Sequence, residues 1–451
     1  MASAPPLLRS PQGQVALLLH LLLFLIVVAT VLTFLPLNDE FLNPSGWYSP
    51  EYYKLKANID KIPTLRRTLK DGFALLLLVG SLWFNPTHPN PQLQRNGDLK
   101  LLYGVGLALL ALALVRTLAT PLGLTNALAT LRPLVMSGAL FVFCHRHLNP
   151  AYLRWVLEAL NPLALLQLYY AYQQRNNSVD WHGVTFWSRG QVRSVGTFAE
   201  PNTLGLFLAL VVYLNLSVLP PHPLRYGLVA AYATTILYFA DSRSGALLMA
   251  MVIILELYRW LSRLDPFLRR PAVLGLAIAP LVLGLSYWLL GEISSSSVRG
   301  DMGDSSGGRL GAVVSAVNSS GPIALLVGKH LGSGSNVLQV LNQVGRSSGM
   351  DLIISDSTLA ALINQVGLLG VMVFGGIIYV LLKLPTHSPA LPGVDSRHPP
   401  PLRQERAGLM AILLLAGLTN VIFEMYALWP ILVPLMFPWH WLGRQPFQQT
   451  I

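Results

Sequence analysis

The chain carries little charge for its length, because Asp, Glu, Lys and Arg make up only 11% of its 451 residues. Soluble domains carry about 25% charged residues, so a soluble fold is excluded. Cysteine is nearly absent too: Cys144 stands alone, which rules out an internal disulfide and a cysteine metal cluster. Histidine pairs at metal-ligand spacing and a Gly-x4-Gly-Lys-Ser phosphate loop are also missing from the sequence. We therefore expect neither a metal nor any other cofactor, and no use of ATP.

What the chain has instead is hydrophobic sequence, at 53% of residues with a mean hydropathy of +0.53. Because a membrane-crossing helix needs about 20 apolar residues, we predict an all-α polytopic membrane protein. About twelve spans are expected, at 15–37, 72–84, 101–119, 124–143, 151–172, 202–219, 226–240, 245–258, 272–290, 357–382, 407–423 and 427–442. The first span has no small-residue cleavage site after it, so it is not expected to be a removed signal.

These spans divide the chain into three parts. Residues 1–290 hold the first nine spans and an external segment at 173–201, residues 291–356 form a long external loop, and residues 357–451 hold the last three spans. The net charge of +11 follows the positive-inside rule if both termini are cytoplasmic, so it does not call for a nucleic-acid partner.

The span at 72–84 is the shortest, since its residues cover only about 20 Å as a helix. Either the helix begins earlier, near Leu65, or the segment re-enters the membrane. Residues 52–70 mix basic and apolar side chains, which is typical of an amphipathic helix on the outer surface.

The external segment 173–201 combines aromatic residues with Arg193 and Glu200. Aromatic residues often form a belt at a membrane interface, and together with arginines they also suit the binding of sugars and phosphates. Both interpretations stand. The Pro201-Asn202 pair predicts a helix start with Asn202 as the N-cap, and such a helix end favours a nearby anion.

The second external segment is the turn 241–245, which contains Asp241 and Arg243. These two residues form either a structural ion pair, as charges near a membrane commonly do, or a site in which Arg243 faces the same cavity as Arg193.

The third external segment, 291–355, is a loop of about 65 residues, too long for a passive connector. We predict a short helix in it that begins near Arg309, and a flexible turn at 328–335 that contains His330. Asp356 then opens the next span, either as a helix cap or as a functional residue.

Four motifs in chain order carry a resemblance to a known family: Arg193-Ser-Val-Gly-Thr-Phe-Ala-Glu200-Pro-Asn202, Ser242-Arg243-Ser-Gly245, Gly308-Arg309-Leu, and Asp356-Ser-Thr-Leu followed by Gly367-Leu-Leu-Gly370. Over roughly residues 100–440, the chain resembles the O-antigen ligase and polymerase superfamily of membrane glycosyltransferases (WaaL-type and Wzy-type). The resemblance implies a GT-C-like helical fold in the bacterial inner membrane, with a long periplasmic loop between the ninth and tenth spans.

The resemblance also implies a reaction at the periplasmic face. A sugar hydroxyl attacks the anomeric carbon of a glycan carried on undecaprenyl diphosphate, with inversion and without a metal. Guanidinium groups bind phosphate oxygens in pairs, so the diphosphate ligands would be Arg193, Arg243 and Arg309. The hydroxyl needs a base, for which Asp356 is the first candidate and Glu200 and His330 are the alternatives.

Ligases of this family have a histidine where this chain has Asp356, which favours a Wzy-type polymerase of O-antigen or exopolysaccharide. The alternatives are a WaaL-type ligase that transfers the glycan to lipid A core, and a lipid-linked oligosaccharide flippase. Transporters usually show two related halves, and the one deep polar feature that would suit them is Arg132-Pro133 in the fourth span. The expected partners are the lipid-linked donor, the acceptor (a lipid-linked repeat or lipid A core), membrane lipid and a chain-length regulator.

Overall fold

The computed structural model describes residues 11–33, 64–86, 96–120, 123–176, 187–188, 191–198, 200–219, 222–264, 308–333, 358–383, 409, 412–413, 417 and 428–437. Within these residues the regular structure is helical, except for a short antiparallel pair formed by β1 (Trp187–Ser188) and β2 (Gln191–Val192). Four stretches are long and apolar enough to cross a membrane: Pro11–Val31, Gly97–Leu118, Pro201–Val218 and Thr358–Leu381. An α-helical membrane fold is therefore confirmed, whereas the number of twelve spans remains a prediction.

The helix α3 (Thr64–Trp83) decides how the short predicted span begins. It has 20 residues, which as an α-helix cover about 30 Å, and it contains most of 72–84. The helix therefore does begin earlier, near Leu65, while its crossing of the membrane stays a prediction. Residues 64–70 belong to this helix and do not form a separate interfacial helix, while 52–63 lie outside the described residues.

Three predicted spans contain irregularities that hydropathy does not reveal. The span 151–172 is divided at Ala159 into α7 (Pro150–Glu158) and α8 (Leu160–Asn176). The next two each end in a π-helical turn, so that α9 (Pro201–Tyr213) runs into η5 (Leu214–Val218), and α10 (Pro223–Thr234) into η6 (Thr235–Phe239). Single π-turns are rare and are frequent at functional sites.

The remaining helices are α1 (Pro11–Val31), α5 (Gly97–Leu118), α6 (Gly123–His147), α11 (Arg243–Leu264), α13 (Gly308–Asn318), α14 (Pro322–Val327), α16 (Thr358–Lys383) and α18 (Trp429–Met436). The short helix predicted near Arg309 is α13. The predicted span 272–290 and most of 407–423 lie outside the described residues.

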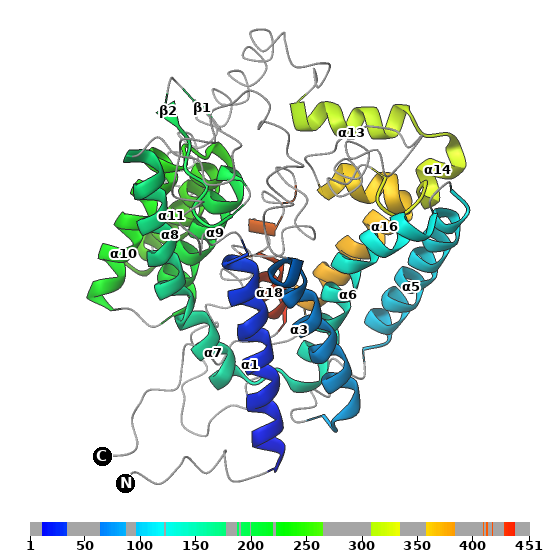
Figure 1. Ribbon diagram of the computed structural model, residues 1–451, viewed down its shortest axis with the longest axis horizontal. Coiled ribbons are helices and arrows are strands. Elements are labelled where there is room, and N and C mark those ends of the chain that lie inside the picture. The colour runs from blue at the N-terminus through cyan, green and yellow to red at the C-terminus, as the bar shows by residue number, and fades with distance from the viewer. Residues whose placement is uncertain are drawn as a thin grey trace.

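The helices form two groups on either side of a central set (Figure 1). One group contains α8, α9, α10 and α11, and in it α9 is almost entirely buried. The other contains α5, α13, α14 and α16, while α1, α3, α6 and α18 lie between them. The short strands, α13 and α14 lie toward one end of the molecule, and the start of α1 lies toward the other (Figure 1). The side of the membrane that each end faces stays a prediction.

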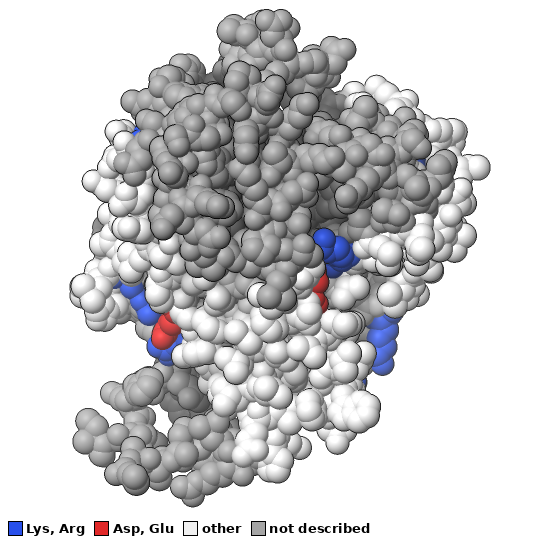
Figure 2. Space-filling model, viewed as in Figure 1, with Lys and Arg blue, Asp and Glu red and all other residues white. Residues whose placement is uncertain are grey.

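The described surface is largely uncharged, as expected for a chain surrounded by lipid (Figure 2). On α5, for example, Leu101, Leu107 and Val115 are each more than 60% exposed. Apolar side chains at such exposure are costly in water and favourable in a bilayer.

Candidate functional site

The loop that carries Arg193 is held by a buried glutamine of α8. The side-chain oxygen of Gln174 accepts hydrogen bonds from the backbone N–H groups of Val195 and Gly196, both at 2.9 Å. Its amide nitrogen donates to the Gly196 carbonyl at 2.7 Å. Because buried backbone polar groups must be paired, Gln174 performs for this loop the role that a neighbouring strand performs in a sheet.

A second glutamine fixes the next residue of the loop. Gln167 lies on the same face of α8, two turns before Gln174, and is buried. It accepts a hydrogen bond from the N–H of Thr197 at 2.8 Å and donates one to the Thr197 hydroxyl at 2.6 Å. That hydroxyl in turn donates to the carbonyl of Val31, near the end of α1. The loop is thus attached to both α8 and α1.

Gly196 allows the loop to make this turn. Its φ of 62° lies in the left-handed region, where a side chain is strained. A Cβ at this position would also lie 2.3 Å from the side-chain oxygen of Gln167. The residue has to be glycine for the glutamine contacts to form.

The Arg193 guanidinium is positioned by neutral oxygen atoms. Its Nε donates to the Ala240 carbonyl at 3.1 Å, and its Nη2 donates to the Asn202 side-chain oxygen at 3.2 Å. The Ser242 hydroxyl donates to the same Asn202 oxygen at 3.4 Å. These bonds orient the guanidinium, and they join the loop, the start of α9 and the turn before α11.

The role predicted for Asn202 is therefore wrong in part. The helix α9 does begin at Pro201, as predicted, but Glu200 occupies the N-cap position. Pro201 takes the first helical position, which its ring favours, and this places Asn202 one residue inside the helix. From there its side chain reaches Arg193 instead of capping the helix.

The π-turn η6 and the residue after it supply the carbonyl groups that accept hydrogen bonds from the Arg193 loop. Carbonyls at a helix C-terminus lack partners inside the helix. Here the Phe239 carbonyl accepts from the N–H of Ser194 at 2.8 Å, and the next carbonyl, of Ala240, accepts from Arg193. Asp241 then turns the chain with a φ of 43°, and the Ser242 hydroxyl caps α11 by accepting from the N–H of Gly245 at 3.2 Å.

Two glycines bring α9 and α11 into close contact beside this site. A Cβ on Gly245 would lie 2.6 Å from the carbonyl carbon of Gly205, and one on Gly205 would lie 2.3 Å from the Ser242 hydroxyl. In the described part of the chain, the buried Ser244 hydroxyl in this junction has no hydrogen-bond partner. The junction therefore has a donor available next to the first residue of α11, Arg243.

Arg243 and Glu200 lie at the two helix starts that form this site. The structure describes the backbone of Arg243, which follows Ser242 directly and so adjoins the segment that holds Arg193. Glu200 is exposed at the start of α9. The binding of a phosphate by Arg243, and a role for Glu200 as base, stay predictions.

His330 lies in the second group of helices, in a loop that fills a break in α16. Gly367 interrupts this helix with φ 71° and ψ −173°. The N–H of Lys329 donates to the Asn364 carbonyl of the interrupted turn at 2.7 Å. The N–H of Leu331 donates to the Thr117 hydroxyl of α5 at 2.8 Å. The predicted turn is present, and its described part is bonded to two helices.

The backbone of the loop around Gly328 packs tightly against the backbone of α16 at this break. A Cβ on Gly367 would lie 2.3 Å from the Leu326 carbonyl oxygen, and one on Gly328 would lie 2.2 Å from the Gln365 carbonyl oxygen. Arg116 of α5 donates to the Gly328 carbonyl. Both glycines are therefore required for the loop to enter the helix, and the loop backbone occupies the break.

The predicted site residues thus fall into two sets. Arg193 and the backbone of Arg243 come together at α9 and α11. The helix of Arg309, α13, and the loop of His330 pack against α16, across α1 and α6 in Figure 1. Asp356 lies outside the described residues, and the structure describes the backbone of Arg309. The convergence of three arginines on one cavity therefore stays a prediction for Arg309.

No group of three His, Cys, Asp or Glu residues close enough to hold a metal ion occurs among the described residues. No family model, no curated protein and no solved structure matches this chain.

Proposed function

We propose that the chain is a glycosyltransferase of the inner membrane that polymerises undecaprenyl-diphosphate-linked repeats at the periplasmic face. The observation that carries this proposal is the placement of Arg193. Its guanidinium is held at the start of a membrane helix by neutral oxygens of Asn202 and Ala240. A charged residue at the start of a membrane helix marks a functional site, and phosphate is the ligand that the forked guanidinium group suits best.

The proposed reaction is a single displacement. The oxygen of the acceptor sugar forms a bond to the anomeric carbon of the donor as the bond from that carbon to the diphosphate breaks. The hydroxyl proton passes to a base, for which the carboxylate of Asp356 is the first candidate, and the carboxylate of Glu200 or the imidazole of His330 the alternatives. Arg193, with Arg243 and Arg309, stabilises the charge that develops on the leaving diphosphate, which is where electrostatic catalysis is most effective.

A ligase would share this chemistry and differ in its acceptor. Purified protein supplied with a lipid-linked repeat alone separates the two activities. A ladder of longer glycans identifies a polymerase. A product that forms only after lipid A core is added identifies the ligase and contradicts the polymerase assignment.

The break in α16 is the observation that favours the transporter alternative, because transporters use interrupted helices to build their binding sites. Here, however, the loop around Gly328 fills the break with its own backbone, so the freed Asn364 carbonyl is already bonded. This arrangement supports a fixed loop rather than an open substrate site. Movement of the lipid-linked repeat across vesicle membranes without any change of the glycan would favour the flippase.

The Arg193→Ala variant tests the proposal directly. We expect it to lose glycan transfer by at least about a hundredfold, because removing even one neutral hydrogen-bond donor that stabilises developing negative charge costs about that much. Arg175→Ala is the matched control, since Arg175 is an arginine of α8 that lies over the ring of Tyr238, 5.1 Å from its centroid. Transfer is measured with purified variants that unfold at the wild-type temperature. Full activity of Arg193→Ala would refute the diphosphate site.

A further inference from the structure

The hydroxyl group of Ser244, the second residue of α11, is buried and has no hydrogen-bond partner within the described part of the chain. The residue as a whole is only 1% exposed. Buried polar groups are nearly always paired, because an unpaired one destabilises the fold. A hydroxyl that is kept here without a partner therefore calls for a physical reason.

The missing bond is explained by the carbonyl that helical serines normally use. A serine inside a helix commonly donates to the carbonyl four residues earlier, as Ser137 does to Pro133 at 2.8 Å. For Ser244 that carbonyl belongs to Ala240, which precedes α11 and accepts the Nε of Arg193 instead. The arrangement that positions Arg193 is therefore also the one that leaves the Ser244 hydroxyl unpaired.

The start of α11 provides further hydrogen-bond donors next to this hydroxyl. The first four N–H groups of a helix have no acceptor inside it. Ser242 accepts from two of them, that of Gly245 through its hydroxyl at 3.2 Å and that of Ala246 through its carbonyl at 2.8 Å. The other two belong to Arg243 and Ser244 themselves, and helical side chains lean toward this end. A negatively charged oxygen is the group that such a helix start attracts.

A chain of hydrogen bonds connects the start of α11 to Arg193. The Ser242 hydroxyl donates to the side-chain oxygen of Asn202 at 3.4 Å, and the same oxygen accepts from the Arg193 Nη2 at 3.2 Å. Ser244 follows Ser242 by two residues. The Ser244 hydroxyl and the Arg193 guanidinium therefore belong to one junction.

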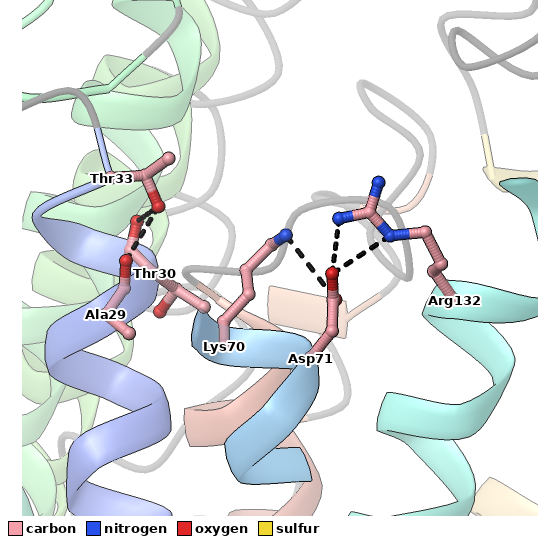
Figure 3. A network of polar contacts seen from close by, with 6 residues as sticks. All are labelled: Ala29, Thr30, Thr33, Lys70, Asp71 and Arg132. Atoms are coloured by element: carbon pink, nitrogen blue, oxygen red, sulfur yellow. Dashed lines mark hydrogen bonds and ion pairs between the residues drawn. The ribbon is translucent and has the colours of Figure 1, made fainter. Parts of the chain in front are cut away.

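The charged cluster between α3 and α6 differs from this junction. Asp71 accepts from the Arg132 Nε at 2.9 Å and from the Lys70 Nζ at 3.5 Å, as Figure 3 shows. The charges of this cluster are bonded to one another and join the two helices. The cluster, which contains the deep arginine that would suit a transporter, therefore calls for no ligand.

We propose that Ser244 is a catalytic residue whose hydroxyl donates a hydrogen bond to the diphosphate of the lipid-linked donor. This inference rests on the proposed function. When the acceptor oxygen displaces the diphosphate, the electron pair of the breaking bond stays on the diphosphate oxygen, and the acceptor proton passes to the base. The leaving group gains one negative charge in this step. A neutral donor that is fixed beside Arg193 and shielded from water stabilises this charge.

A comparison of Ser244→Ala with Ser81→Ala tests this role. Ser81, in α3, is fully buried, and its hydroxyl also lacks a partner among the described residues. Both variants should unfold at the wild-type temperature or above it, because each removes an unpaired buried hydroxyl. Only Ser244→Ala should lower kcat, by about a hundredfold, the typical cost of losing one donor to developing charge. Ser244→Cys keeps a weaker donor of similar shape, so its kcat should be intermediate.

Inhibition by the product, undecaprenyl diphosphate, separates contact with the leaving group from a structural role. This product carries the additional negative charge that the diphosphate acquires only on reaction. We therefore expect Ser244→Ala to raise the inhibition constant of undecaprenyl diphosphate by about tenfold, as for the loss of a hydrogen bond to a charged group. The KM for the lipid-linked donor should stay nearly unchanged, because the donor lacks this charge. Both constants are measured with the full-length protein in nanodiscs.

A wild-type kcat in Ser244→Ala would overturn the inference. An equal loss of kcat in Ser81→Ala would do so as well, and so would a KM that rises as much as the inhibition constant. Arg193→Ala keeps this result distinct from failure of the proposed function. Loss of transfer in Arg193→Ala with full activity in Ser244→Ala contradicts the role of Ser244 alone. Full activity in Arg193→Ala, or no transfer by the wild-type protein, contradicts the proposed function and this inference with it.

Discussion

Uncharged side chains orient the guanidinium of Arg193. Asn202 contacts it directly, and Gln174 holds the loop that carries it. Arg193, Arg243 and Glu200 are recognisable in sequence because charge is rare in this chain. Gln167 and Gln174 are not, since a glutamine in an apolar helix also suits a lipid-facing end or a helix contact. Their function depends on a loop that lies 22 residues after Gln174 and 30 after Gln167, and only the fold brings loop and helix together.

Gln174→Leu should loosen the loop while leaving α8 intact. It removes three hydrogen bonds and leaves the N–H groups of Val195 and Gly196 buried without their acceptor. Each unpaired buried group costs about 1–3 kcal/mol, so we expect unfolding free energy to fall by about 2 kcal/mol or more. The KM for the lipid-linked donor should also rise, because Arg193 is no longer fixed.

Thermal unfolding and donor-dependent kinetics check this prediction, with Gln173→Leu as the control. Gln173 is the neighbouring residue of α8, partly exposed and directed elsewhere on the helix. An increase in KM confined to Gln174→Leu supports a positioning role. Equal increases in KM in both variants would show that any replacement of a polar by an apolar residue at this end of α8 disturbs activity, and would contradict the positioning role.

At the element scale, hydropathy predicts where apolar helices lie but not how they are interrupted. The predicted spans near α1, α5, α6, α9, α11 and α16 correspond to helices in the structure. The division at Ala159, the π-turns η5 and η6, and the break at Gly367 went unpredicted. Each depends on one or two backbone angles or on a bond to a distant loop, and such features leave the average hydrophobicity of the segment unchanged.

The close crossing of α9 and α11 gives a prediction at this scale. Gly245→Ala would place a methyl group 2.6 Å from the Gly205 backbone, so the helices must separate. Overpacking of this kind costs about 1–3 kcal/mol. Transfer activity should fall as well, because Ser242 and Asn202 lie in the same junction.

Gly227→Ala provides the matched control for that change. Gly227 lies inside α10, and a Cβ there would meet nothing within 4 Å. Alanine is the better helix former by about 1 kcal/mol, so this variant should be as stable as wild type or more so. Unfolding temperatures in detergent decide the comparison, and a Gly245→Ala variant as stable as Gly227→Ala would contradict the close crossing.

At the scale of the whole molecule, the proposed function requires the donor site at Arg193 to face the side of the membrane on which the lipid-linked glycan is presented. The loop of Arg193 follows β2, and the short strands lie toward the same end of the molecule as α13 (Figure 1). The proposal therefore depends on that end facing the periplasm, which the positive-inside rule predicts.

Cysteine labelling tests this orientation with little background, because Cys144, the only native cysteine, is buried. Asn318 at the end of α13 and Asp98 at the start of α5 are both exposed. A membrane-impermeant maleimide added to intact cells with a permeable outer membrane should label Asn318→Cys. Asp98→Cys should react only after the inner membrane is opened, since this end of α5, near Arg95 and Lys100, is predicted to be cytoplasmic. The reverse pattern would place Arg193 on the cytoplasmic side and contradict the proposed periplasmic site.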